Sequence, residues 1–444
     1  MTVVSVSKFL CAAAVLALTA CGDKDVILTG ERENIRSVLS EEDIQAQALQ
    51  AETGTVPPLK LPAIRANPNW TQGIASSITR VAHPQLSAAP RVIWSTDIGQ
   101  GDGRKIRITA DPVVADGRVF TLDSSATVTA LSTLGEVLWR RELTPVNESE
   151  KDASGGGLAY ADGELYVSTG FGILTAIEAS SGVTRWEQNL RATSSGSPTV
   201  AGDLVYVVAG DNLAWALERS DGRIRWQLAA SPDIRNVLGA PSPAVAEEFV
   251  IFAFGSGEVQ GAFRKGGLRR WDAQVAGRRV GFATGLIDDI TGDPVIDAGR
   301  VYVGNHSGST VALNLNNGER LWTAPDGAFN PIWPAGDSIF MVTDRNELLR
   351  LSAEDGRRIW ARTLPFFTKN KPRRQNEIFA HHGPIVAGGR LILASNDGLL
   401  RFYDPTTGAP MGESELPGDI TTNPVVAGGT LYLVTTKGQL LALR

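Results

Sequence analysis

Apolar residues recur along this chain in short alternating runs that are separated by Gly- and Asn-containing turns, which is the pattern of β-hairpins. The stretch 294–322 shows the pattern most clearly, with Val301 and Val303 on one face of a strand and Val311 and Leu313 on one face of the next. Strands are expected here at 294–297, 300–305, 310–315 and 319–322. A single four-stranded sheet cannot bury its apolar faces alone, so the pattern predicts neighbours of the same kind.

The neighbours are present as repeats that begin with a Pro or Leu and end with a Gly four residues before a Trp. Copies lie at 112–139, 158–186, 198–226, 243–271, 294–322 and 331–360. A seventh begins at Pro384 but has Gly412 in the Trp slot, and an eighth begins at Pro424 and ends at Arg444 without a last strand. The orphan strand 91–94, with its own Trp94, can supply that strand. We therefore expect an all-β, eight-bladed β-propeller over residues 88–444, built of four-stranded antiparallel blades and closed by the N-terminal strand, so that no open edge remains.

The repeat resembles the quinoprotein-type β-propeller repeat, whose markers here are a small residue after a strand and the closing Gly and Trp. The small residues are Ala130, Ala176, Ala216 and Ala312. The Trp residues occupy one register of the outer strand, so we expect each indole to pack between adjacent blades and to donate its N–H to a nearby carbonyl. Because propellers host many activities, the fold alone does not define the function.

The N-terminus has the features of an exported lipoprotein. Lys8 precedes an apolar run at 9–18, which is too short to span a bilayer and indicates a signal peptide over 1–20. Small residues before Cys21 resemble the lipobox of bacterial lipoproteins, which implies cleavage before Cys21 and its lipidation. Asp23 follows Gly22 rather than the Cys directly, and by the same resemblance the chain is sorted to the outer membrane, facing the periplasm. The net charge of −6 argues against a nucleic-acid partner.

Residues 21–87 lack the repeat and are expected to form a lipid-anchored, partly extended tether. The stretch 56–62 is rich in Pro, which favours extended backbone. Trp70 stands alone in this polar segment, and we expect it to dock on the ring.

Length varies mainly in the links that join one blade to the next, and in a propeller these links emerge on one face. Loops on a rigid scaffold carry function, so this face is the predicted binding face. The longest link contains a basic run at 369–374. Such a run is usually a solvated loop, and contact with anionic lipid or with an acidic partner is the alternative.

Quinoprotein dehydrogenases share this repeat, and the resemblance implies that they need a calcium site, a catalytic Asp and often a Cys pair. This chain keeps no thiol pair after processing, and no acidic cluster has metal-ligand spacing. His306, His381 and His382 are expected to be structural or solvent-facing, because adjacent His residues in a strand point to opposite faces. The sequence therefore predicts no catalytic residue, no cofactor and no metal.

A lipobox, a tether, a closing strand and eight blades together resemble the BamB family of outer-membrane assembly lipoproteins. That resemblance implies a scaffold that docks on the periplasmic repeat domains of the BamA-type barrel insertase, and it extends to unfolded outer-membrane protein clients held by strand addition. Two links are expected to make the contact, and in both the family motif is imperfect, since the Arg is displaced in the first and Thr291 replaces an Asp in the second. The expected contact residues are Arg235, Val237, Leu238 and Gly239 in the first link and Asp288, Asp289 and Ile290 in the second.

Two other functions are compatible with the same repeat. One is a quinone-dependent dehydrogenase, and the other is a periplasmic propeller that binds cell-wall glycans, for which no specific sugar site is visible in the sequence.

Lipidation can be tested directly at the predicted acceptor. Cells that express the wild-type chain and take up labelled palmitate are expected to label the protein, and Cys21→Ala is expected to remove the label because the thiol and the new amino group are both lost. Equal labelling of the two proteins would exclude Cys21 as the acceptor.

Overall fold

The fold was analysed in a computed structural model, which describes residues 56–74, 80–194, 196–231, 241–275, 290, 292–306 and 308–444. The chain divides into two compact units, 1–47 and 48–444, and all the described residues belong to the second. The predicted signal peptide and Cys21 lie outside the described residues.

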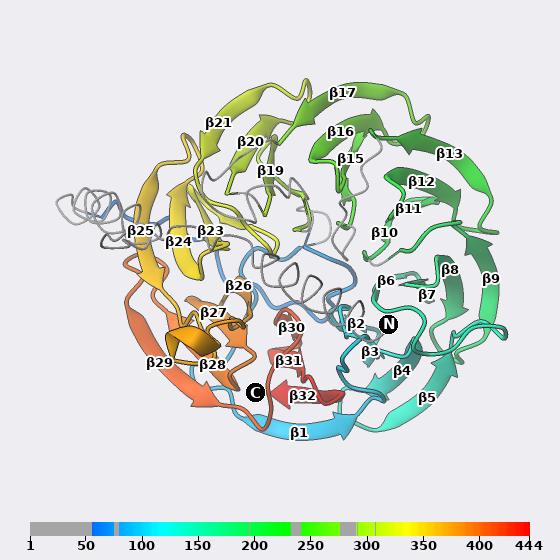
Figure 1. The fold of residues 1–444 in the computed structure, drawn as a ribbon, viewed down its shortest axis with the longest axis horizontal. Coiled ribbons are helices and arrows are strands. Elements are labelled where there is room, and N and C mark those ends of the chain that lie inside the picture. Colours follow the sequence, from blue (N-terminus) through cyan, green and yellow to red (C-terminus); the bar gives the residue numbers. More distant parts are fainter. Residues whose placement is uncertain are drawn as a thin grey trace, which may run out of the picture. The chain divides into compact units, whose positions relative to one another are not determined.

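The second unit is an eight-bladed propeller in which every blade is a four-stranded antiparallel sheet, as predicted (Figure 1). Blades 1 to 4 comprise β2 (Val113–Ala115), β3 (Arg118–Leu122), β4 (Thr127–Ser132), β5 (Val137–Glu142); β6 (Gly156–Ala161), β7 (Glu164–Thr169), β8 (Ile173–Glu178), β9 (Thr184–Asn189); β10 (Thr199–Ala201), β11 (Leu204–Ala209), β12 (Leu213–Glu218), β13 (Ile224–Ala229); and β14 (Ala244–Val245), β15 (Phe249–Ala253), β16 (Glu258–Phe263), β17 (Arg269–Gln274). Blades 5 to 8 comprise β18 (Val295–Asp297), β19 (Arg300–Gly304), β20 (Thr310–Asn314), β21 (Arg320–Ala324); β22 (Trp333–Ala335), β23 (Ser338–Val342), β24 (Glu347–Ser352), β25 (Arg358–Thr363); β26 (His381–Ala387), β27 (Arg390–Ser395), β28 (Leu399–Tyr403), β29 (Pro410–Glu415); and β30 (Val425–Ala427), β31 (Thr430–Val434), β32 (Gln439–Leu443), β1 (Val92–Asp97).

Burial decreases from the inner strands of a blade to its outer strand, and the strands become less apolar in the same direction. Strand β11 is buried at every residue because neighbouring blades cover both of its faces, and it is correspondingly apolar. The outer strand β13 alternates between exposed and half-buried residues. The stretch 294–322, which shows the repeat most clearly, forms β18–β21 close to the expected bounds, except that its last strand continues to Ala324.

Each outer-strand Trp joins its blade to the next one, as predicted. The indole N–H groups of Trp94, Trp139, Trp186, Trp226, Trp271, Trp322 and Trp360 donate to the carbonyl groups of Thr133, Ala179, Arg219, Arg264, Leu315, Ala353 and Pro405, respectively. The repeat Gly of the next blade lies directly on the ring. A Cβ built on Gly356, which has a φ of +72°, would approach Trp322 Cε3 to 2.6 Å. The Gly and Trp of the motif are therefore two halves of one contact between consecutive blades.

The ring closes where the N-terminal strand β1 pairs with β32, so that Trp94 lies opposite Ala442 (Figure 1). Arg91 and Arg444 exchange two backbone hydrogen bonds of 2.9 Å beyond the end of this ladder. In blade 8 the third and fourth strands are thus the two ends of the ring and no turn joins them. In the other blades, the Gly that contacts the Trp of the preceding blade lies in the turn between the third and fourth strands. Blade 8 has no such turn, so a Trp in blade 7 would have no Gly to stack on. This explains why Gly412 occupies the Trp position.

Blade 7 compensates for the missing indole with a different contact. In blade 5 the small Ala312 faces Trp322, whereas in blade 7 the large Phe402 faces Gly412. The guanidinium of Arg390 lies 4.6 Å from the centre of the Phe402 ring. Arg390 also donates hydrogen bonds to the carbonyl groups of Ser87 and Ala88, and so holds the chain just before it enters the closing strand.

The segment before β1, which we call the strap (residues 56–74 and 80–90), packs on the ring rather than running free. Trp70 is buried, pairs with Val114 of β2 through two backbone hydrogen bonds of 2.7 and 2.8 Å, and stacks on Trp333 with ring centroids 6.2 Å apart. The Gln72 side chain exchanges two hydrogen bonds with the backbone of Val200 in blade 3. The docking of Trp70 is confirmed, and the described strap contacts the ring from Pro57 onward.

Within the described residues, no helix has both the length and the apolar character that crossing a bilayer would require.

The Trp–Gly contact predicts a difference between two glycines with the same backbone conformation. Gly356→Ala is expected to lower the melting temperature much more than Gly299→Ala, since a Cβ at Gly356 meets the Trp322 ring while one at Gly299, with a φ of +76°, meets no atom within 4 Å. Both changes carry the strain of a left-handed Ala, which costs about 1–2 kcal/mol, and only the first adds overlap. Thermal unfolding followed by circular dichroism measures the difference, and equal losses would contradict the role of the stack.

Candidate functional site

The predicted binding face carries the links between blades, and the bases of these links are fixed by the turns between the second and third strands. We call this the link face. The first residue of a link donates its backbone N–H to such a turn, as Leu143 does to Ala126, Ala230 to Asn212 and Leu364 to Asn346, at 3.0, 2.9 and 2.8 Å. Ala126, Asn212 and Asn346 all have positive φ, which turns their carbonyl groups towards the link. The links therefore leave the ring from defined positions.

The first predicted docking link joins blades 3 and 4, and its expected contact residues Arg235, Val237, Leu238 and Gly239 lie outside the described residues. The described base of this link is held at Ser231, whose N–H donates to the Glu258 carboxylate at 2.9 Å and whose carbonyl accepts from the Asn212 amide at 3.2 Å. Burial alone would raise the pKa of Glu258, but hydrogen bonds from Ser231 and Gln260 outweigh it and lower that pKa. An ionised Glu258 thus anchors the start of the link.

The second predicted docking link joins blades 4 and 5, and its residues Asp288 and Asp289 also lie outside the described residues. Ile290 is described, and the expectation that its side chain meets a partner needs correction. It is fully buried in an apolar cluster with Val275, Ile251 and Val303. An apolar side chain at the polar end of this link gains more from the cluster than from water, so Ile290 fixes the link to the core.

A second polar feature lies on the propeller axis, where residues two positions before the inner strands of neighbouring blades contact each other in pairs. Asn423 donates to both carboxylate oxygens of Asp111, at 2.7 and 3.0 Å, and Ser242 donates its backbone N–H to Asp293 at 2.7 Å. The two aspartates line a cavity of about 40 Å³ that the strap residues Trp70 and Gln72 also line. Burial raises the pKa of Asp111 to about 6 and that of Asp293, which Asp111 also repels, to about 7.

Sequence reasoning did not single out this axial pair, although a signal was available. Asp111 and Asp293 stand directly before Pro112 and Pro294, the residues that open their repeats, so the repeat itself places them at the axis. Cavities of this size hold a few water molecules, since one water needs about 10–15 Å³. Within the described ranges, no three His, Cys, Asp or Glu side chains are grouped so that they could hold a metal ion.

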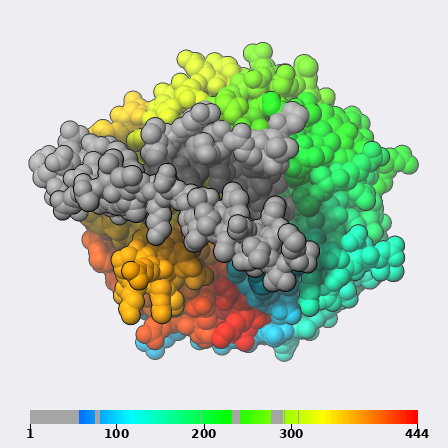
Figure 2. Space-filling view, viewed as in Figure 1, coloured from blue at the N-terminus to red at the C-terminus, as the bar shows by residue number. Residues whose placement is uncertain are grey.

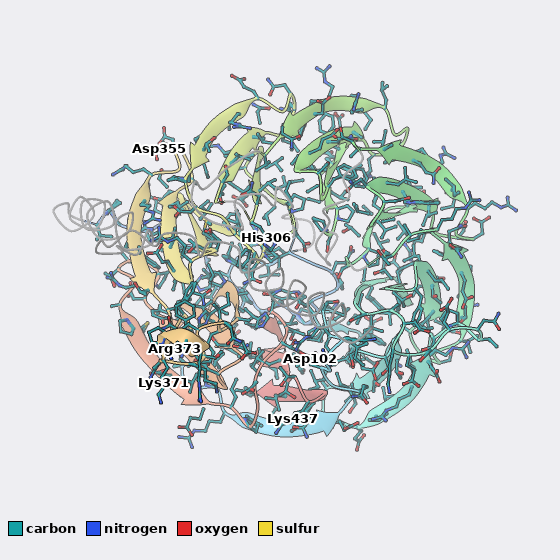
Figure 3. All side chains as sticks on the ribbon, in the orientation of Figure 1. Asp102, His306, Asp355, Lys371, Arg373 and Lys437 are labelled. Carbon is teal, nitrogen blue, oxygen red and sulfur yellow. The ribbon has the colours of Figure 1, made fainter. Side chains whose placement is uncertain are left out.

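The histidines have structural surroundings. The ring nitrogens of His381 lie 2.6 Å from the Ser395 hydroxyl and 2.8 Å from the Pro365 carbonyl, and burial lowers its pKa. Burial also lowers the pKa of His382 and of His306 to about 4, and the His306 ring lies 4.3 Å from that of Phe329 (Figure 3). All three are therefore neutral at pH 7.

The fold and its inter-blade contacts define a class of protein, the eight-bladed propellers built of quinoprotein-type repeats. Within that class the sequence profile of one family, described as outer membrane protein assembly factor BamB, matches residues 124–362 and 370–444. This match covers more than half of the chain, and the chain belongs to that family.

Individual relatives agree with this assignment. Outer membrane protein assembly factor BamB of Salmonella typhimurium is 28% identical over 366 residues, which cover 80% of this chain and 88% of the relative. The BamB of Escherichia coli K12 is 26% identical over 361 residues, again covering 80% and 88%.

Solved structures support the fold. The crystal structure of BamB from Moraxella catarrhalis superposes with a TM-score of 0.66 at 16% identity, covering 80% of this chain and all of that one. A quinohemoprotein alcohol dehydrogenase from Comamonas testosteroni superposes with a TM-score of 0.61 at 14% identity, covering 85% and 80%. Both assembly factors and dehydrogenases thus share this architecture, and the fold by itself does not separate them.

The buried axial pair predicts how stability depends on pH. Because the pKa of Asp293 rises from 3.8 to about 7, the folded protein holds this proton more tightly than the unfolded chain does. The resulting stabilisation is complete below pH 3.8 and is lost as the pH rises through 7. Asp293→Asn is therefore expected to gain stability relative to wild type as the pH rises from 4 to 8, as measured by urea unfolding.

The exposed Asp355 provides the control, because a hydrogen bond from Ser352 lowers its pKa. Asp355→Asn should show no such gain. If Asp293→Asn and the wild type keep the same difference in unfolding free energy across this range, Asp293 does not titrate as described.

Proposed function

We propose that this protein is a non-catalytic scaffold subunit of the machinery that assembles β-barrel proteins in the outer membrane. The observation that carries the proposal is the BamB family match over nearly the whole ring. In this proposal the protein is anchored to the outer membrane through Cys21, faces the periplasm, and docks on the periplasmic domains of the BamA-type insertase.

The link face is the surface proposed for docking. The links around Leu238 and Asp289 start from fixed bases at Ser231 and Val275, whose backbones are bonded to blade 4. A rigid base limits the conformational entropy that a contact loop loses on binding. We propose that Leu238 enters an apolar pocket of the insertase while Arg235, Asp288 and Asp289 guide its approach.

The geometry of the axis favours a scaffold over a quinone-dependent enzyme. The axial cavity of about 40 Å³ is far smaller than the roughly 300–1,000 Å³ of typical small-molecule sites. Its carboxylates are already engaged by Asn423 and Ser242, and strap residues form part of its wall. The described residues that line this cavity do not fit a quinone with its metal ion.

The proposal extends to the clients of the machinery. Each blade ends in an outer strand with one unpaired edge, and β5 and β29 are almost wholly exposed. An extended segment of an unfolded outer-membrane protein can add to such an edge through backbone hydrogen bonds.

Docking is tested with one variant that places a charge in the first link and reverses a charge in the second. The variant Leu238→Glu with Asp289→Arg is expected to lose co-purification with the insertase from detergent-solubilised membranes, because a charge replaces the apolar anchor and an acidic guide becomes basic. Its melting temperature should stay close to that of the wild type.

The matched control makes the same kinds of change in a link remote from these two. Val146→Glu with Glu148→Arg alters the link between blades 1 and 2, where Val146 is fully exposed. The control should keep the insertase bound. Retention by the first variant, or an equal loss in both, would reject the docking surface named here.

A further inference from the structure

The link between blades 6 and 7 forms a protruding arm (residues 365–380) whose two limbs are bonded to each other. Phe367 pairs with Ile378 in an antiparallel bridge, and the Phe379 N–H donates to the Phe366 carbonyl at 2.8 Å. The tip contains a short 3₁₀ helix, η2 (Pro372–Arg374), in which the Arg374 N–H donates to Lys371 at 2.8 Å. In Figure 2 the arm is the orange mass that stands forward over blade 7.

The base of the arm is clamped to the ring by one buried side chain. The Asn346 amide donates to the carbonyl of Pro365 on one limb and to that of Phe379 on the other, at 3.1 and 2.9 Å. His381 bonds the same Pro365 carbonyl, and the Asn396 side chain accepts from the Ala380 N–H at 2.9 Å. The position of the tip is therefore set by the propeller.

The tip is strongly basic although the protein is acidic overall. Lys369, Lys371, Arg373 and Arg374 are all exposed, and Figure 3 shows Lys371 and Arg373 at this tip. None of the four forms an ion pair within the described part of the chain, whereas many other arginines there do. The nearby Glu377 accepts a hydrogen bond from Thr368 on the opposite limb. The four cations thus face solvent without compensation in a chain of net charge −6.

We propose that this arm binds an acidic segment of a partner protein, with the four cations contacting carboxylates and the half-buried Phe367 and the exposed Ile378, which are paired in the bridge, receiving an apolar side chain. Arg373 and Arg374 can each bond a carboxylate through two parallel N–H groups. A cluster of positive charges attracts an oppositely charged partner to this one point and sets its orientation.

The shape of the arm favours a protein over a lipid surface. Attraction of basic residues to anionic headgroups requires no fixed backbone, whereas this arm is held by a backbone bridge, a 3₁₀ turn and the Asn346 clamp. Preorganisation of this kind reduces the entropy lost on binding a defined partner. The arm is distinct from the links around Leu238 and Asp289. An experiment that excludes binding at one of these surfaces therefore leaves the proposal for the other unaffected.

The test compares the full-length protein with two charge-reversal variants. The first is Lys371→Glu, Arg373→Glu, Arg374→Glu in the arm. The matched control is Arg104→Glu, Lys265→Glu, Arg270→Glu, which makes the same change in net charge at exposed positions that form no ion pair within the described part of the chain. Fluorescence anisotropy measures the binding of fluorescein-labelled decaglutamate at about 0.05 M and about 0.5 M salt, and co-sedimentation measures binding to phosphatidylethanolamine vesicles with and without phosphatidylglycerol.

The wild type and the control are expected to bind decaglutamate with similar affinity at low salt. The arm variant should bind it at least about tenfold more weakly, since three attractive contacts become repulsive. High salt should reduce the difference. Absence of binding by the wild type, or equal weakening in the two variants, would overturn the proposal. Loss confined to the vesicles would overturn it in favour of an anionic lipid surface.

A photo-crosslinking residue at Asn370 then tests the arm in cells. The crosslinked peptide is expected to come from an acidic stretch of a protein. Crosslinks to a neutral or basic stretch would contradict the proposal.

Discussion

Closure of the ring is the constraint on which this structure depends. A four-stranded blade has two broad apolar faces, and each is buried only while a neighbour covers it. The pairing of β1 with β32 gives blade 8 its outer strand, and through it every other blade keeps two neighbours. The repeated Trp–Gly contact fastens each junction at the rim except the one between blades 7 and 8. There the stacking partner is absent, and Arg390 with Phe402 holds the entering chain instead.

The sequence was sufficient for the fold because the relevant information is local and repeated. The alternation in 294–322 defines one blade, and the recurrence of its Gly and Trp defines the rest, including the role of Trp94. The strap was only partly predictable. Trp70 stood out as a large apolar residue in a polar segment, but its partners Val114 and Trp333 lie in two different blades, and no periodicity relates them to it.

The candidate site was likewise only partly predictable from the sequence. That the links share a face follows from the strand order, and the structure shows how residues such as Asn212 and Asn346 fix their bases. Ile290 shows the limit of motif comparison, because its neighbours in sequence are polar while its side chain belongs to the core. The basic run 369–374 was visible in the sequence. Its presentation on a clamped arm was not, since the clamp joins Asn346 to residues far along the chain.

The location of the closing strand has a consequence for biosynthesis. Synthesis proceeds from the N-terminus, so β1 and the strap emerge before any blade exists to receive them. Their partners in blade 8 follow only after the other seven blades. Until then an unpaired strand edge and the apolar flank of blade 1 remain open to wrong association. A chain that is truncated before β32 lacks the strand that pairs with β1. Pairing of these two strands therefore gives protein quality control a feature that distinguishes a closed ring from a truncated one.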